Sequence, residues 1–238
     1  MNRLAMMLLK NAFRVPGVYA TLCRYAKEPD RYPEEETWAY IRHVMGLAVK
    51  SGNVELEVIG LENIPKEPGF MLYGNHQGMF DVVAIAHTCQ PPLGIVYKKE
   101  LKEVPLLKQI LTCTKSFAMD REDVRQSLTV IQAVTREVQS GRNYVVFPEG
   151  TRSRTGNTMG EFHGGSFRCA VKAKCPVVPM AFIDCFKVLD QKGSKPVKVQ
   201  LHYLTPILYE EYKDLKPAEL AELVKGRIQA CIDDHTRG

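Results

Sequence analysis

Short apolar segments alternate with amphipathic helical segments along most of this chain, and this alternation constrains its fold more than any other feature. Strand patterns occur at 54–60, 70–75, 93–97, 116–120, 143–150, 176–183 and 197–204. Helical patterns lie between and after them, at 80–87, 101–111, 122–141, 166–173 and 217–235. Strands that alternate with helices of this length predict one α/β domain, with a central mostly parallel or mixed sheet flanked by helices.

The first part of the chain shows helical patterns only. One covers 2–27 and is expected to break at Pro16 and Gly17, and the second covers 35–50. We therefore expect an N-terminal helical pair at 1–52, followed by the α/β domain at 53–238.

The first helical pattern is amphipathic. At about 100° per residue, Arg3, Lys10 and Arg14 form a narrow basic stripe. The broad opposite arc holds Leu4, Leu8, Leu9, Ala12 and Phe13. This pattern fits a helix in a membrane interface, with its cations towards anionic headgroups. It fits equally well a helix packed on the domain core, with its basic stripe in water.

Charge and cysteine content exclude few classes of partner. The formal net charge of +5 suits anionic partners, which leaves nucleic acids, membrane surfaces and phosphorylated metabolites open. The seven cysteines include no CxxC pair, so we expect a reducing compartment and neither a disulfide framework nor a metal site. The sequence holds no run of about 18 apolar residues, the length expected of a helix that spans a membrane.

The segment NHQGMFD follows a predicted strand and places a histidine five positions before an aspartate. Within one regular helix the two side chains would lie about 140° apart, so His76 and Asp81 pair only if His76 stays in the loop before the helix. The carboxylate would then fix the imidazole tautomer and leave the other ring nitrogen free to take a proton from a substrate hydroxyl. Taken alone, the same residues also fit a helix cap beside an ordinary loop histidine.

The segment FPEGTRS follows another predicted strand. Arginine presents a planar set of donors that matches phosphate, so Arg152 is the candidate phosphate ligand, with hydroxyl donors from Ser153 and Thr151. Lys98 and Arg121 each follow a further strand and are candidates for the same anion. A solvated basic loop is the alternative for these residues.

The segments NHQGMFD, KKELKEVP…MDR, FPEGTRS and CPVVP occur in the order and approximate spacing of the four blocks of the glycerolipid acyltransferases. Over about Val54 to Leu204, the sequence resembles most closely the 1-acylglycerol-3-phosphate acyltransferases of the PlsC type. The first and third blocks together are highly specific for this family, whereas either block alone is weaker evidence for it. Three positions depart from the family pattern: Lys108 and Lys115 stand near places where glycine is common, and His163 stands where lysine is common.

The resemblance implies a role for each block. His76 would be the general base that deprotonates a glycerol hydroxyl, Asp81 would orient it, and backbone N–H groups near the helix start would stabilise the oxyanion. The residues implied in binding the substrate phosphate are Lys98, Arg121, Glu149, Gly150, Thr151 and Arg152. The residues implied in the wall of the acyl channel are Pro148, Val178 and Pro179.

The function implied by the resemblance is acyl transfer from an acyl-carrier-protein or coenzyme A thioester to the sn-2 hydroxyl of 1-acylglycerol 3-phosphate, which gives phosphatidic acid. The resemblance implies no bound cofactor, no metal and no nucleic acid. It also implies a peripheral or monotopic enzyme on the cytoplasmic face of a membrane, docked through its N-terminal helices. Two alternatives stay open: an acyltransferase for glycerol 3-phosphate, another lysophospholipid or an amino-acid lipid, and a membrane- or anion-binding module without catalysis.

Overall fold

The computed structural model describes residues 2–120 and 122–236, with helices and strands alternating as the sequence predicts. The strands are β1 (Val54–Ile59), β2 (Met71–Gly74), β3 (Leu93–Lys98), β4 (Phe117–Met119), β5 (Asn143–Val146), β6 (Val177–Ile183) and β7 (Val197–Tyr203). The α-helices are α1 (Arg3–Lys10), α2 (Val15–Lys27), α3 (Glu34–Ser51), α4 (Phe80–Thr88), α5 (Leu107–Cys113), α6 (Val124–Gln139), α7 (Arg168–Ala173), α8 (Phe186–Leu189), α9 (Tyr209–Tyr212) and α10 (Pro217–Thr236). Short 3-10 turns are η1 (Leu61–Asn63), η2 (Lys99–Leu101) and η3 (Gly164–Phe167).

Within the described residues, the strands form one sheet in the order β1-β7-β6-β2-β5-β3-β4. Strands β2 to β6 are parallel to one another, whereas β7 is antiparallel to β6, and β1 is parallel to β7. The prediction of a mostly parallel or mixed sheet is therefore confirmed. Because the carboxyl ends of β2 to β6 meet at one edge, the loops that follow these strands converge there.

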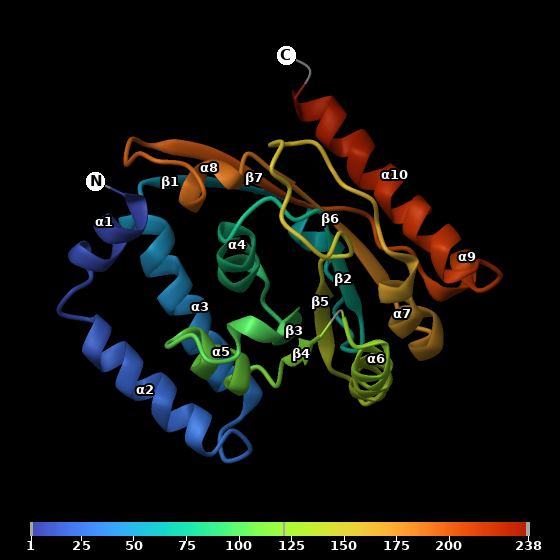
Figure 1. Cartoon of the computed structure of the whole chain (residues 1–238), viewed down its shortest axis with the longest axis horizontal. Coiled ribbons are helices and arrows are strands. Elements are labelled where there is room, and N and C mark those ends of the chain that lie inside the picture. Colours follow the sequence, from blue (N-terminus) through green and yellow to red (C-terminus); the bar gives the residue numbers. More distant parts are fainter. Residues whose placement is uncertain (1, 121, 237–238) are drawn as a thin grey trace.

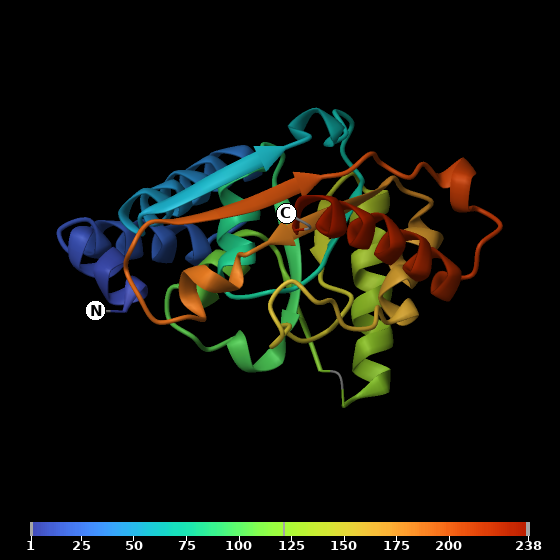
Figure 2. The same cartoon turned by 90° about the horizontal axis from the view of Figure 1, so that it is seen from above.

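Helices cover both faces of the sheet (Figures 1 and 2). Leu72 of β2 and Phe182 of β6 pack into a core with α1 to α5, whereas Tyr73 of β2 and Ala181 of β6 pack into a second core with α6, α7 and α10. Successive side chains of a strand point to opposite faces, so a sheet covered on both faces has continuous apolar central strands. Every residue of β2, β5 and β6 is buried, which leaves the strand-end loops as the place for exposed chemistry.

The structure differs from the predicted helix boundaries in two places, both near a proline. The N-terminal region holds three helices rather than two, because the first pattern breaks at 11–14, ahead of Pro16. That proline lies in the first turn of α2, where a backbone N–H would have no acceptor within the helix, so its absence costs no hydrogen bond. The helix predicted at 101–111 begins only at Leu107, since Pro105 lacks an N–H and disfavours helical backbone in the residue before it.

The prediction that Arg3 belongs to an outward-facing basic stripe is wrong. Its side chain is buried, and its guanidinium donates to four backbone carbonyl oxygens. These belong to Gly52 (3.0 Å), Lys187 (3.2 Å), Val188 (3.1 Å) and Lys195 (2.6 Å). Four acceptors compensate the loss of hydration, so Arg3 fastens α1 to the end of α3, to α8 and to the segment that follows α8.

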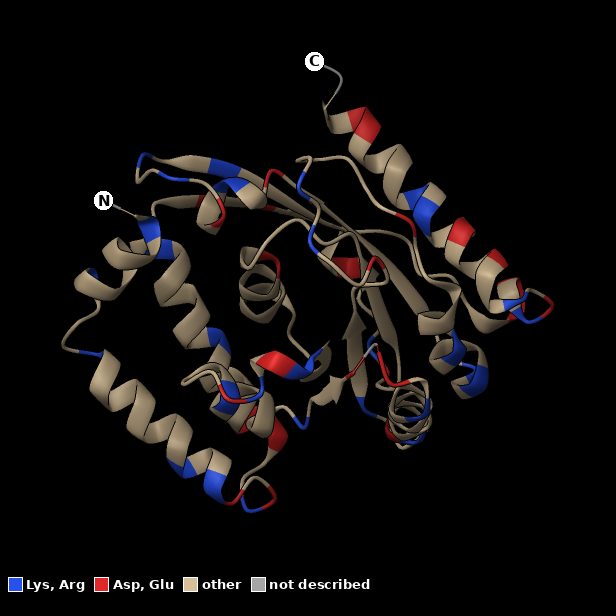
Figure 3. Ribbon diagram, in the orientation of Figure 1, with Lys and Arg blue, Asp and Glu red and all other residues tan. Residues whose placement is uncertain are grey.

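The apolar arc of α1, in contrast, faces outwards. Leu9 is 66% exposed and Phe13 is fully exposed, and the apolar side chains continue onto α2. We call this set the N-terminal apolar surface; it comprises Leu4, Leu8, Leu9, Phe13, Val15 and Tyr19. Figure 3 shows that most of α2 carries neither Lys nor Arg, which appear only towards its C-terminal end. Among the described residues, no helix combines the length and apolar character needed to cross a bilayer.

Candidate active site

The candidate site begins where β2 ends. The strand ends at Gly74 and α4 begins at Phe80, so His76 lies in the connecting loop and Asp81 in the first turn of α4. Nδ1 of His76 lies 2.7 Å from Oδ2 of Asp81. The structure thus has the loop-and-helix arrangement that a pairing of these two side chains requires.

Asp81 fixes the tautomer of His76. Asp81 is fully buried, and its Oδ2 also accepts the backbone N–H groups of Gln77 (2.6 Å) and Gly78 (2.9 Å). An oxygen that accepts two backbone hydrogen bonds serves as acceptor for the imidazole too, so Nδ1 carries the hydrogen and Nε2 keeps its lone pair. Burial raises the pKa of Asp81 above its usual value, against the opposing effect of His76 and the two backbone N–H groups.

The imidazole ring of His76 is also held on one face. The ring of Phe147, the residue after β5, stacks on it with the centroids 4.2 Å apart and the planes 24° from parallel. The side chain of His76 remains 20% exposed. The ring is therefore fixed in orientation and still open to a substrate.

The first and third sequence blocks are joined through the backbone of His76. The N–H of His76 donates to Oε1 of Glu149 (2.7 Å), and its carbonyl oxygen accepts the N–H of Ser153 (2.7 Å). Oε2 of Glu149 accepts the N–H of Gly160 (2.8 Å). The position of His76 therefore depends on the FPEGTRS loop, which gives a physical reason for the two blocks to occur together.

Glu149 was expected among the phosphate-binding residues, and its geometry does not support that role. The carboxylate is buried, and both of its oxygens accept backbone N–H groups. Burial raises its pKa, while those two backbone hydrogen bonds oppose the shift. A carboxylate oxygen cannot donate to a phosphate, so Glu149 shapes the loop instead.

Arg152 lies in the same loop, next to Ser153, and its guanidinium is half exposed. Nη1 donates to Oδ1 of Asp190 (2.6 Å), and Oδ2 of Asp190 accepts the N–H of Met79, the residue before α4 (3.0 Å). An arginine and the N-terminus of a helix are the two groups that proteins use most directly to bind anions. A carboxylate of the chain itself thus occupies an anion-binding arrangement beside His76.

The other residues predicted to bind the substrate phosphate make no hydrogen bond to Arg152 among the contacts of the described residues. Lys98 ends β3 at the same sheet edge, exposed, with its ammonium 3.3 Å from Glu100. Thr151 is exposed in the turn, and Gly150 has φ of +73°, a backbone conformation that glycine adopts without strain. Arg121 lies outside the described residues.

The backbone N–H groups near the start of α4 were expected to stabilise an oxyanion. The N–H groups of Gln77 and Gly78 are used by Asp81, and that of Met79 is used by Asp190. The expectation is therefore not supported for these three groups, because the two carboxylates already occupy them.

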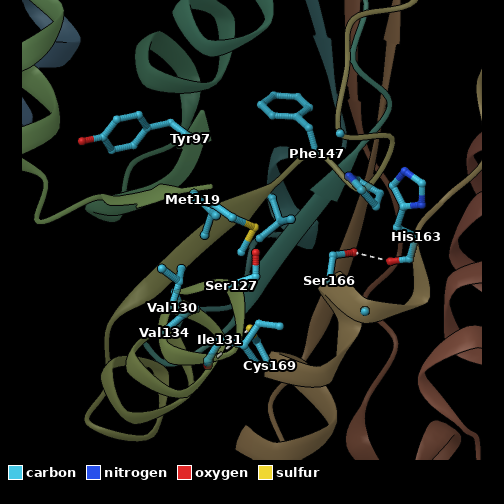
Figure 4. A pocket seen from close by; sticks show the side chains of 15 residues that line it. Tyr97, Met119, Ser127, Val130, Ile131, Val134, Phe147, His163, Ser166 and Cys169 are labelled. Atoms are coloured by element: carbon cyan, nitrogen blue, oxygen red, sulfur yellow. Dashed lines mark hydrogen bonds between the residues drawn. The ribbon is translucent and has the colours of Figure 1, made fainter. Parts of the chain in front are cut away.

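A mostly apolar cavity of about 350 Å³ opens next to the FPEGTRS loop, on the α6 and α7 face of the sheet (Figure 4). Its lining includes Val96, Val130, Ile131, Val134, Val146 and Phe147. Phe147, which stacks on His76, is one of the lining residues, but its ring packs with the core on the opposite face of the sheet. Of the three residues predicted to wall an acyl channel, Pro148 lines this cavity, whereas Val178 and Pro179 do not, and Val178 belongs to the core on the opposite face.

The departures from the family pattern have different surroundings. His163 lines the cavity. Lys108 pairs with Glu103 at 2.7 Å, away from it. Lys115 has φ of +49°, which explains why glycine suits this place, and its ammonium lies 2.8 Å from Asp30.

Two residues of the site, Asp190 and Gln77, were not predicted from the sequence. Asp190 follows β6 at the edge where the loops converge, but an aspartate in a polar loop has no local pattern that distinguishes it from a solvated one. Gln77 lies inside the first block, where its Nε2 donates to Oδ1 of Asn157 (2.7 Å) and its Oε1 accepts the N–H of Cys185 (2.9 Å). This side chain ties together the loops that follow β2, β5 and β6.

Comparison with known proteins gives consistent names. The family model described as Acyltransferase matches residues 55–183. A 1-acyl-sn-glycerol-3-phosphate acyltransferase from Saccharomyces cerevisiae is 29% identical over 194 residues, which cover 78% of this chain and 61% of that protein. A protein of the same name from Borreliella burgdorferi is 23% identical, with 79% and 76% covered, and one from Pseudomonas aeruginosa is 34% identical, with 60% and 54% covered. The match thus spans about three fifths of the length of the yeast relative.

A solved structure shares the fold. The crystal structure of the 1-acyl-sn-glycerophosphate (LPA) acyltransferase PlsC from Thermotoga maritima superposes with a TM-score of 0.77 at 21% identity, covering 99% of this chain and 98% of that one. The resemblance noted in the sequence blocks is confirmed by the family model, the named relatives and this fold. The family model alone covers more than half of the residues, and the chain therefore belongs to the Acyltransferase family.

Proposed function

We propose that this protein transfers an acyl chain from a thioester to the sn-2 hydroxyl of 1-acylglycerol 3-phosphate and so forms phosphatidic acid. One observation carries the proposal: a tautomer-fixed imidazole, His76, shares its loop contacts with the segment that holds Arg152. The names of the relatives supply the acceptor, lysophosphatidate.

In the proposed reaction, Nε2 of His76 removes the proton of the sn-2 hydroxyl as its oxygen attacks the thioester carbonyl carbon. The new C–O ester bond forms, the C–S bond breaks, and the imidazolium returns the proton to the departing sulfur. The buried Asp81 holds Nδ1–H and stabilises the transient imidazolium. The nucleophile belongs to the substrate, so no side chain is acylated.

The substrate phosphate is proposed to bind where Asp190 now lies. The donors that face this carboxylate are the guanidinium of Arg152 and the N–H of Met79 at the start of α4. Both suit a phosphate oxygen. Binding would displace Asp190 from Arg152 and place the glycerol beside His76, since Ser153 hydrogen-bonds to the His76 carbonyl.

Replacement of Asp190 with asparagine is expected to lower the KM for lysophosphatidate about two- to fivefold, with kcat changed less than twofold. The reason is that asparagine keeps the shape but removes a charge that competes for Arg152, and partly exposed ion pairs contribute about 1 kcal/mol or less. Steady-state kinetics on detergent-dispersed lysophosphatidate measure it.

The controls for this prediction are Asp214→Asn, an exposed aspartate after α9, and the Arg152→Ala background, in which Asp190→Asn should have no effect on KM. A KM raised by Asp190→Asn would instead mean that Asp190 holds Arg152 in its productive position.

The apolar cavity is proposed to receive the acyl chain. Its lining is mostly apolar, and it lies next to the FPEGTRS loop, whose Phe147 contacts His76, so a thioester carbonyl near Nε2 would have an apolar space close by for its chain. The acyl donor is proposed to be a thioester of acyl carrier protein or coenzyme A, with no bound cofactor. Residues 53–238 are proposed as the catalytic domain.

Residues 1–52 are proposed to dock the protein on the cytoplasmic face of the membrane through the N-terminal apolar surface. An exposed, largely uncharged arc next to helices that carry basic residues is the pattern of an interfacial helix. The substrate and the product proposed here are both lipids of that surface.

The double replacement Leu9→Asp and Phe13→Asp is expected to weaken binding to lipid vesicles at least tenfold, because each large apolar side chain contributes about 1.5–3 kcal/mol when fully buried. Co-sedimentation with phosphatidylglycerol–phosphatidylcholine vesicles measures it. The matched control is Leu208→Asp, also an exposed apolar side chain but beside α9, at the opposite side of the molecule (Figure 1). Unchanged sedimentation of the double variant would contradict the docking surface.

The acceptor is tested with a radiolabelled acyl thioester and a panel of lysophosphatidate, glycerol 3-phosphate, lysophosphatidylcholine and monoacylglycerol. The proposal expects the highest kcat/KM with lysophosphatidate and labelled phosphatidate as product. A higher value with another acceptor would replace the substrate and keep the chemistry. Vesicle binding without transfer to any acceptor would support a non-catalytic module instead.

A further inference from the structure

A thiol and two imidazoles meet on the sheet face that α10 covers. Cys231 and His235 lie four residues apart on α10, which places them on one side of the helix. His202 lies on β7, buried beneath them, and its ring meets that of His235 edge to face with the centroids 4.3 Å apart. One ligand atom from each of the three side chains lies within 4.8 Å of the others. None of these residues belongs to the candidate active site.

Neighbouring groups fix the tautomer of His202. Oε2 of Glu57 can only accept, so it orients the amide of Gln200 with Nε2 towards itself (3.1 Å). The amide oxygen of Gln200 then faces Nε2 of His202 at 3.0 Å. Nε2 must therefore carry the hydrogen, which leaves Nδ1 with a lone pair.

The same reasoning applies to His235. Its Nδ1 lies 2.9 Å from the carbonyl oxygen of Cys231, an acceptor, and 4.0 Å from Sγ of the same residue, so Nδ1 donates to the carbonyl and Nε2 keeps a lone pair. Metal-binding histidines almost always donate their second ring N–H to a carboxylate, a backbone carbonyl or water, as His235 does here to the carbonyl of Cys231.

We propose that His202, Cys231 and His235 form a binding site for a zinc ion. Two imidazole nitrogens and one thiolate are a donor set that suits Zn²⁺, with water as the fourth ligand on the side where His235 is exposed. Tetrahedral Zn²⁺ places its nitrogen and sulfur ligands about 3.3–3.8 Å apart, so the side chains need to close by about 1 Å. The ring of His235 also needs to turn, because Nδ1 rather than Nε2 now faces Sγ of Cys231. His235 lies in the last turn of α10, where such an adjustment is easily made.

Binding changes the protonation of the thiol. The ion displaces the thiol proton to solvent and binds the thiolate. The bound ion then links the end of α10 to β7.

The absence of a CxxC pair led to the expectation of no metal site. A CxxC pattern detects only ligands that are close in sequence, whereas the proposed site joins a residue of β7 to a Cys-x3-His pair on α10. The only signal in the sequence is the four-residue spacing on α10, which by itself occurs often without a metal.

The test is equilibrium dialysis of the full chain, stripped with a chelator and then titrated with ZnCl2, with bound metal measured by mass spectrometry. We expect one Zn²⁺ per chain and a raised melting temperature. Titration with CoCl2 should add near-ultraviolet absorption from a cobalt–thiolate bond. Cys231→Ser and His235→Ala should each weaken Zn²⁺ binding at least tenfold, and Gln200→Leu, which frees the His202 tautomer, about 10- to 100-fold.

The matched control is Cys23→Ser, a partly buried cysteine on α2, which should leave metal content and the cobalt spectrum unchanged. The altered side chains are not fully buried, and circular dichroism verifies the fold of each variant. Failure of the parent chain to bind one equivalent, or equal binding by Cys231→Ser, would overturn the proposal. Acyl transfer plays no part in this test, so its outcome is independent of the proposed enzymatic function.

Discussion

Replacement of His76 with alanine is expected to lower the turnover number for acyl transfer by two to four orders of magnitude, the contribution of a positioned general base. The variant loses the imidazole that Asp81 and Phe147 hold in a fixed orientation. Binding of lysophosphatidate should change little, because Arg152 and the cavity stay intact. A single-turnover assay with labelled thioester measures the chemical step.

A matched control separates this effect from damage to the fold. His43→Ala removes an exposed imidazole from α3 and should keep full turnover. Added free imidazole should restore part of the activity of His76→Ala, because the space beneath Phe147 is then open to a small base. Retention of more than a tenth of the parental turnover without imidazole would remove His76 from its proposed role.

Asp81→Asn provides the second half of this argument. The amide keeps the volume of the buried carboxylate, but it no longer dictates that Nδ1 carries the hydrogen. We therefore expect turnover to fall nearly as far as in His76→Ala, and the double variant to be no worse than either single one, because the two side chains act as one unit.

The elements of the sheet were predictable because their patterns are local. Strands such as β2 and β6 are short apolar runs with every residue buried, and parallel pairing places their ends at one edge. The sequence predicted that the His76 loop and the Arg152 loop each follow a strand, and the parallel pairing of β2 with β5 places both loops at one edge. The helix boundaries failed at Pro16 and Pro105, where the placement of a proline relative to the helix start decides the outcome.

The contacts that complete the site were not predictable, because they join segments far apart in the chain. Arg3 fits an outward stripe by helical angle, yet it meets carbonyl groups more than 180 residues away. Asp190 likewise meets Arg152 across 38 positions. A helical wheel or a local motif assigns a direction to a side chain, but not its partner.

Glu149→Ala is the second change expected to have a large effect, and it tests why the two blocks occur together. The carboxylate accepts the N–H groups of His76 and Gly160 in a buried setting. Removing it leaves two donors unsatisfied at about 1–3 kcal/mol each, so the free energy of unfolding should fall by about 2–6 kcal/mol. Chemical denaturation monitored by circular dichroism measures this loss.

The same change should lower kcat about 100-fold even where the variant is fully folded, because a displacement of His76 by about 1 Å is enough for such a loss. The stability and kcat of Glu149→Gln should lie between those of the parent protein and of Glu149→Ala. The amide oxygen of glutamine can accept one of the two N–H groups, while its NH2 group faces the other. Glu161→Ala, an exposed neighbour in the same loop, should change stability by less than about 0.5 kcal/mol and leave kcat unaltered. If folded Glu149→Ala kept the parental kcat, the loop would serve stability alone, and the coupling of the base to the arginine segment would have to come from Ser153.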